Sequence, residues 1–146
     1  MILDAQNQFS DAQAVIAAAV STNSIDLGLV AQNIGVGEVL YLVVNVATAL
    51  TNGGGGTGVD VILVDDDNAA LTSPADLLTI GQLSSTAAAG TRLVYKLGPD
   101  VIGTQRYYGV RYNPTGANLT GGTIDAFIVH DIDAWTAYPV GLYRTP

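Results

Sequence analysis

The chain has 146 residues, of which 49% are hydrophobic and only 12% are charged, and its formal net charge is −8. Five cationic side chains are too few to neutralise a run of phosphates, so the composition argues against binding to nucleic acid or to an anionic membrane surface. The absence of cysteine excludes a disulfide framework, a thiolate metal site and a cysteine nucleophile.

The length is that of one compact domain. With so few charges, much of the surface must consist of Ser, Thr, Asn, Gly or apolar side chains, which is typical of a subunit that buries its faces against partners. A Thr- and Gly-rich sandwich of the secreted type would have a similar composition. The first residues show no basic stretch followed by an apolar one, and no segment reaches the roughly 18 apolar residues of a membrane span. We therefore expect a soluble protein that is made in the cytoplasm.

The first candidate element is ambiguous between helix and strand. Residues 11–20 (DAQAVIAAAV) have strong helix propensity, and Ser10 with Gln13 could form a capping box. The continuation over residues 21–28 is poor helix material, however. We therefore predict an early strand that runs into a second strand at residues 25–27.

Two strongly apolar segments follow. Residues 39–46 (VLYLVVNV) alternate with period two, and the near-continuous apolarity indicates that both faces of the strand are at least partly covered. Residues 59–64 repeat the pattern. The loop between them contains Gly53, Gly54, Gly55 and Gly56, without the G-K-[ST] of a phosphate loop. The pattern predicts a hairpin with a flexible glycine tip, or a tip that is ordered only on contact with a partner.

Further strands are predicted at residues 77–83, 93–97, 107–112 and 124–129, each bounded by turn-forming residues. About eight short antiparallel strands indicate an all-β sandwich. The spacing is compatible with a jelly roll, although an immunoglobulin-like sandwich would give almost the same pattern, and periodicity does not reveal strand order.

The last residues depart from this alternation. We expect a sandwich domain over residues 1–131 and an extended aromatic tail over residues 132–146. The tail contains Trp135, Tyr138, Leu142 and Tyr143, which would be poorly placed in solvent. It therefore either folds back on its own domain or docks on a neighbour, where such side chains are favoured anchors.

No motif of catalysis or metal binding is present. His130 is the only histidine, and no G-x-S-x-G elbow or H-E-x-x-H helix surrounds it, so a structural or surface role is expected. Residues 65–68 (DDDN) lack the spacing of a calcium loop and are typical of an Asp-rich turn at the end of a strand. We predict neither enzymatic activity nor a cofactor.

Tyrosines and arginines cluster in the predicted strand at residues 107–112. Tyr108, Val110 and Tyr112 share one face, which is the better candidate for the core. Tyr107 and Arg111 lie on the other face and are candidates for an interface. Tyr with Arg would also suit a sugar-binding surface, so a carbohydrate-binding or adhesin-like module is an alternative.

Several segments, taken in their order along the chain, resemble the cement or capsid-decoration proteins of tailed phages, of the type found in a short-tailed Bordetella phage. They include the opening MILDAQ with Phe9 and SDAQA, the segment STNSIDLG at 21–28, and VGEVLYLVV at 36–44. The likeness continues through DDNAA at 66–70, SP at 73–74, RYYGVRY at 106–112 and TIDAFIVHD at 123–131.

This resemblance implies a jelly-roll-like sandwich that sits on the outer surface of an icosahedral head and reinforces it. The partner would be the major capsid protein, and the location would be the virion. The resemblance supplies no catalytic residues. Closed symmetry and the axes of an icosahedral lattice favour a homo-oligomer, either a dimer or a trimer.

Overall fold

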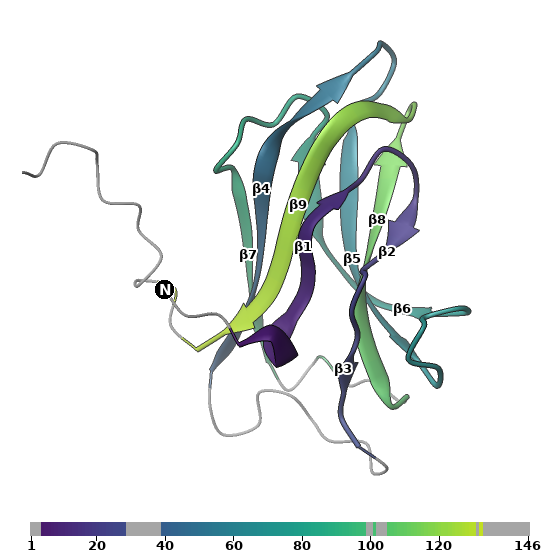
Figure 1. The fold of residues 1–146 in the computed structure, drawn as a ribbon, viewed down its shortest axis with the longest axis vertical. Helices are drawn as coiled ribbons and strands as arrows, with labels where there is room; N and C mark the ends of the chain where they lie inside the picture. Colours follow the sequence, from purple (N-terminus) through teal and green to yellow (C-terminus); the bar gives the residue numbers. More distant parts are fainter. Residues whose placement is uncertain (1–3, 29–38, 99–100, 102–104, 131, 133–146) are drawn as a thin grey trace, which may run out of the picture.

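The computed structural model describes residues 4–28, 39–98, 101, 105–130 and 132. In this part of the chain, nine antiparallel strands form two sheets that pack face to face (Figure 1). A short 3-10 turn, η1 (Ala5–Asn7), precedes the strands. The strands are β1 (Gln8–Ala14), β2 (Ala19–Val20), β3 (Ile25–Asp26), β4 (Leu40–Asn52), β5 (Gly58–Asp66), β6 (Ala75–Ser84), β7 (Arg92–Leu97), β8 (Tyr107–Thr115) and β9 (Leu119–Val129).

The strand order identifies the sandwich as a jelly roll. One sheet has the order β1-β9-β4-β7, and the other has the order β2-β8-β5-β6, with β3 also paired to β8. β2 and β3 pair with successive parts of β8 and together take the place of one strand. The fold therefore corresponds to the eight strands of a jelly roll, with four in each sheet. The expected all-β sandwich is confirmed, and the jelly roll replaces the immunoglobulin-like alternative.

The core lies between the sheets and follows from the period-two patterns. In β4, Leu42, Val44 and Val46 are fully buried in the core cluster, opposite the apolar residues of β5. Val43 faces the other way and is still only 1% exposed, which confirms that both faces of this strand are covered. Tyr108 and Tyr112 are also buried in the core, as their position in the β8 pattern predicts.

The predicted hairpin between residues 39–46 and 59–64 is wrong. β4 pairs with β7 and β9, whereas β5 pairs with β6 and β8 in the opposite sheet. The glycine segment therefore connects the two sheets. The reason is that both strands have strongly apolar inner faces, and these faces oppose each other across the core instead of lying side by side in one sheet.

The strand prediction at residues 11–20 is correct in type but not in extent. The chain leaves one sheet after Ala14 and enters the other at Ala19, so the segment is divided between β1 and β2. Ser10 does contact Gln13, with a hydroxyl to Oε1 distance of 2.7 Å, but it does so within a strand and caps no helix. The strand predicted at residues 25–27 corresponds to β3. The four later predicted strands correspond to β6, β7, β8 and β9.

Candidate interaction surfaces

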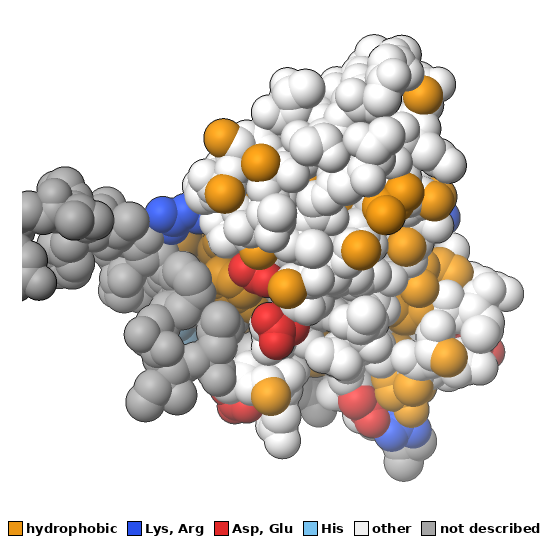
Figure 2. Space-filling view, turned by 45° about the horizontal axis from the view of Figure 1, so that its top comes forward, with side chains coloured by type: hydrophobic (Ala, Val, Ile, Leu, Met, Phe, Trp, Pro, Cys, Tyr) orange, Lys and Arg blue, Asp and Glu red, His pale blue; other side chains and the backbone are white. Residues whose placement is uncertain are grey.

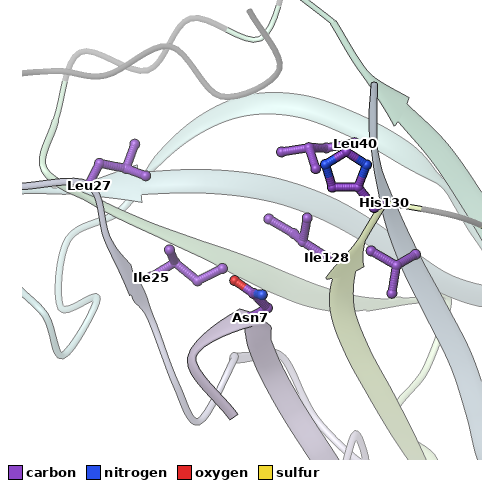
Figure 3. A pocket seen from close by; sticks show the side chains of 7 residues that line it. Asn7, Ile25, Leu27, Leu40, Ile128 and His130 are labelled. Atoms are coloured by element: carbon purple, nitrogen blue, oxygen red, sulfur yellow. The ribbon is translucent and has the colours of Figure 1, made fainter. Parts of the chain in front are cut away.

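A cleft opens at one end of the sandwich, where β9 ends and β4 begins (Figure 3). Its volume is about 320 Å³. In Figure 3 the Asn7 amide points in between Ile25 and Ile128, and the His130 ring lies beside Leu40. The lining side chains are Asn7, Ile25, Leu27, Leu40, Ile128, Val129 and His130.

The cleft is an extension of the core that the described residues leave open. Ile25, Leu27 and Leu40 are only partly buried and pack against the core cluster from its edge. Leu27 is held in place by its backbone N–H, which donates to the carbonyl of Arg106 at 3.0 Å. Because five of the seven lining residues are aliphatic, the cleft favours an apolar group with one polar edge.

A second, polar depression adjoins this cleft and shares Asn7 and Ile25 with it. Its volume is about 510 Å³, and Gln6, Ser24 and Asp26 complete its lining. The two hollows together form a groove that is apolar at the His130 side and polar at the Asp26 side.

Asp26 belongs to an exposed cluster with Arg106 and Tyr107. The Arg106 guanidinium donates to both oxygens of the Asp26 carboxylate, at 2.7 and 2.6 Å. This pairing, helped by the backbone N–H of Gly28, lowers the pKa of Asp26 from 3.8 to about 2. The same guanidinium lies over the ring of Tyr107, 5.0 Å from its centroid. One face of the Tyr107 ring is therefore already occupied.

Tyr107 and Arg111 face outward from β8, as their alternation with buried Tyr108 and Tyr112 predicts. Both side chains are partly exposed. Arg111 forms an ion pair with Asp76 of β6, the edge strand of the same sheet, across the intervening strand β5. Gly109 lies between them, and Leu71 packs directly on it. Leu71 thus separates the two residues, and each arginine has a carboxylate partner of its own.

The glycine tip, residues 53–56, forms a turn that is hydrogen-bonded to the Asn52 side chain. The Asn52 side chain donates from Nδ2 to the carbonyl of Gly56 at 2.7 Å and accepts from the N–H of Gly54 at 2.9 Å. Strand register places the tip at the opposite end of the sandwich from Tyr107, because Gly58 pairs with Thr115 whereas Asp66 pairs with Tyr107. These two predicted surfaces therefore do not meet.

The Asp-rich turn predicted at residues 65–68 begins later than expected, because β5 continues through Asp66 and the chain turns after it. The Asp66 carboxylate accepts the N–H groups of Ser73 and Asn68 at 2.8 and 3.1 Å, which lowers its pKa. Among the residues that the structure describes, no three His, Asp or Glu side chains are grouped so as to hold a metal ion. None of the described helices is long and apolar enough to cross a membrane.

The surface carries few charges, and Figure 2 shows small groups of hydrophobic side chains scattered over a mostly uncharged face. Ile16, Val39 and Val94 are between 42% and 47% exposed. The predicted tail residues Trp135, Tyr138, Leu142 and Tyr143 lie outside the described residues.

Comparison with known families matches the chain to the Bbp16 family over residues 9–128. The chain belongs to the Bbp16 family. The family name suggests a protein of a Bordetella phage, in line with the resemblance noted above. No curated protein matches the chain. The Bbp16 match takes in the sandwich from β1 to β9 but stops before His130 and does not reach Asn7, so part of the cleft rim and the whole tail lie beyond it.

Sequence reasoning did not find the cleft. Its lining comes from residues 7, 25, 27, 40 and 128–130, which are brought together only by the strand order. The one available signal was that apolar residues stand at the ends of predicted strands, and that signal does not show which ends meet.

Proposed function

We propose that this chain is a structural protein of a phage virion, which binds the outer surface of the icosahedral head and bridges subunits of the major capsid protein. The observation that carries the proposal is membership of the Bbp16 family across the jelly roll. In this role the chain would act by binding to capsid subunits and not by catalysis.

The surface properties support this role. Only 12% of the residues are charged. Arg106, which precedes β8, forms an ion pair with Asp26, and Arg111 of β8 forms one with Asp76. Burying such a surface requires little desolvation of unpaired charge. Exposed Ile16, Val39 and Val94 add apolar area that a partner would cover.

A bridging protein needs two separate contact surfaces on one stiff body. The glycine tip and the cleft lie at opposite ends of the same sandwich. When one subunit straddles two capsomers, the second contact becomes intramolecular, so modest interfaces suffice across many copies.

Purified heads that lack this chain, titrated with purified chain, would test the proposal. We expect saturable binding, cryo-EM density for the sandwich on the outside of the shell, and heads that withstand higher temperatures before releasing DNA. Heads that already carry the chain serve as the control and should bind no more. Density inside the shell, or no binding at any concentration, would refute the proposal.

No observation specifically favours the carbohydrate-binding alternative, because Arg106 occupies one face of Tyr107 and Leu71 separates Tyr107 from Arg111. Glycan binding that is lost on Tyr107→Ala, together with an absence of binding to heads, would reverse this preference.

A further inference from the structure

β7 forms an open edge of its sheet in the part of the chain that the structure describes. It is the last strand in the order β1-β9-β4-β7, and its described partner is β4 (Figure 1). Its register with β4 runs unbroken from Arg92 to Leu97. The other described edge strands are less regular, because β2 and β3 have two residues each and β1 and β6 contain register shifts. Since short or bulged strands protect a sheet edge, β7 is the described edge best able to accept another strand.

The backbone of β7 directs every second residue toward this open edge. The N–H of Val46 donates to the carbonyl of Thr91 at 2.9 Å. In an antiparallel pair such hydrogen bonds recur at alternate residues along each strand. The N–H and C=O groups of Arg92, Val94 and Lys96 therefore point away from β4, where an added strand could bind them.

The side chains of the same three residues form a regular pattern on the outer face of the sheet. Arg92 and Lys96 are exposed, and Val94 between them is 46% exposed. Leu93 and Tyr95 alternate with them and pack against the core from the inner face. The outer face of β7 thus presents a cation, an apolar group and a second cation in one row.

Arg92 and Lys96 differ from the other described cations in their surroundings. Arg106 and Arg111 are held in ion pairs, whereas no ion pair within the described part of the chain involves Arg92 or Lys96. Asp125 of β9 shares the outer face with Arg92 but is separated from it by β4. Two cations without a described carboxylate partner therefore lie at the open edge of a chain whose net charge is −8.

We propose that β7 binds an acidic, extended strand of a partner protein, which adds to the sheet antiparallel to β7. The partner's strand carries two acidic residues four positions apart, opposite Arg92 and Lys96, and an apolar residue midway, opposite Val94. Backbone hydrogen bonds to the open edge give affinity, and the cross-strand charge pairs give specificity. This inference goes beyond the capsid role and does not depend on it, because it concerns the chemistry of the edge alone.

The sequence argues against this chain as the source of the added strand. No two of its thirteen Asp and Glu residues are four positions apart, so neither another segment of the chain nor a second copy carries the required pattern. Two β7 strands paired about a two-fold axis at Val94 would place Arg92 opposite Lys96 twice. Like charges that lie directly opposite each other destabilise a sheet. The charges of β7 thus disfavour a second copy and favour an acidic partner.

Hydrogen exchange of the full chain, followed by NMR, tests first whether the edge is open. We expect the amides of Arg92, Val94 and Lys96 to exchange at least about tenfold faster than those of Leu93 and Tyr95, which alternate with them and bond to β4. Slow exchange at all five amides in the free protein would mean that another part of the chain covers the edge, and the proposal would be wrong.

A synthetic peptide with blocked ends and the sequence TETVTET then supplies the acidic strand. When it is titrated into the full chain, it should slow exchange at the amides of Arg92, Val94 and Lys96. The peptide EETVTTT has the same composition and charge without the spacing, and it is the matched control. It should bind at least about tenfold more weakly, because only one of its acids can lie opposite a cation. Equal binding of the two peptides would show diffuse charge attraction and would overturn the proposal.

A charge exchange separates recognition from folding. The variant Arg92→Glu with Lys96→Glu changes two exposed side chains and should keep the circular dichroism of the parent chain. It should lose binding of TETVTET and gain binding of the reversed peptide TKTVTKT, by at least about tenfold in each direction. Binding of TETVTET that survives the charge reversal, or no binding of this peptide to the parent chain at millimolar concentration, would show that β7 does not take an acidic strand.

Discussion

The two ends of the sandwich are built on different principles. At the glycine tip, the Asn52 side chain hydrogen-bonds the turn and the backbones of two loops touch, since a Cβ at Gly116 would lie 2.3 Å from the carbonyl oxygen of Gly55. At the other end, apolar side chains surround an open cleft, and an exposed ion pair between Asp26 and Arg106 stands beside it.

The two ends therefore differ in how far the described residues fill and hydrogen-bond them. At the tip end, the Asn52 and Ser85 side chains hydrogen-bond the turn, and residues 52–57 and 115–118 contain no charged side chain. At the cleft end, the described residues place aliphatic side chains and the Asn7 amide along an open hollow. Substitutions at the tip should therefore lower the stability of the fold more than substitutions at the cleft.

The largest expected effect is that of Gly116→Ala at the tip. Gly116 has a φ of +82°, and the new Cβ would meet backbone atoms that cannot move aside cheaply. We expect the free energy of unfolding to fall by about 2–4 kcal/mol, measured by denaturant titration.

Gly90→Ala is the control for this prediction. Gly90 has a nearly equal φ of +86°, but no atom lies within 4 Å of the position that a Cβ would take there. Gly90→Ala should lower the free energy of unfolding only by the cost of the left-handed backbone conformation, about 1 kcal/mol. Equal losses at the two glycines would mean that the contact between the two loops contributes nothing.

Two asparagines allow the two ends to be compared with the same substitution. Asn52→Ala removes the side chain that holds the glycine tip and should reduce stability by roughly 1–3 kcal/mol. Asn7→Ala should change monomer stability by less than about 0.5 kcal/mol, because the Asn7 side chain is exposed at the cleft. Thermal melts at low protein concentration measure the stability of both variants. A larger loss of stability for Asn7→Ala than for Asn52→Ala would contradict the proposed difference between the two ends.

The sequence predicted the strands well because strand formation depends on local alternation. Tyr108, Val110 and Tyr112 could be assigned to the core, and Tyr107 and Arg111 to the opposite face, from period two alone. The same alternation could not tell that residues 39–46 and 59–64 lie in opposite sheets, because it fixes which way a side chain points but not which strand lies next to it.

The surfaces were harder to predict for the same reason. The glycine run suggests flexibility, but its order depends on Asn52 and on contact with the loop before β9. Arg111 looked available for a ligand, yet its partner Asp76 lies on β6, which is separated from β8 by β5 in the same sheet, and period two does not reveal this strand order. The Arg111–Asp76 pair and the contact between Gly55 and Gly116 each join residues that are distant in sequence, although Asn52 directly precedes the glycines.

The smallest expected effect concerns charge at the cleft end. The pKa of Asp26 is lowered to about 2, so its ion pair with Arg106 favours the folded state above pH 4, and this contribution disappears as the pH falls toward 2. Asp26→Asn should therefore reduce stability slightly at neutral pH, and the variant and the parent chain should converge in acid. An NMR titration of the Asp26 carboxyl checks the cause, since Arg106→Met should return its pKa toward 3.8. A titration unaffected by Arg106→Met would show that the Gly28 N–H alone sets this pKa, and the cleft end would then depend on backbone hydrogen bonds just as the tip does.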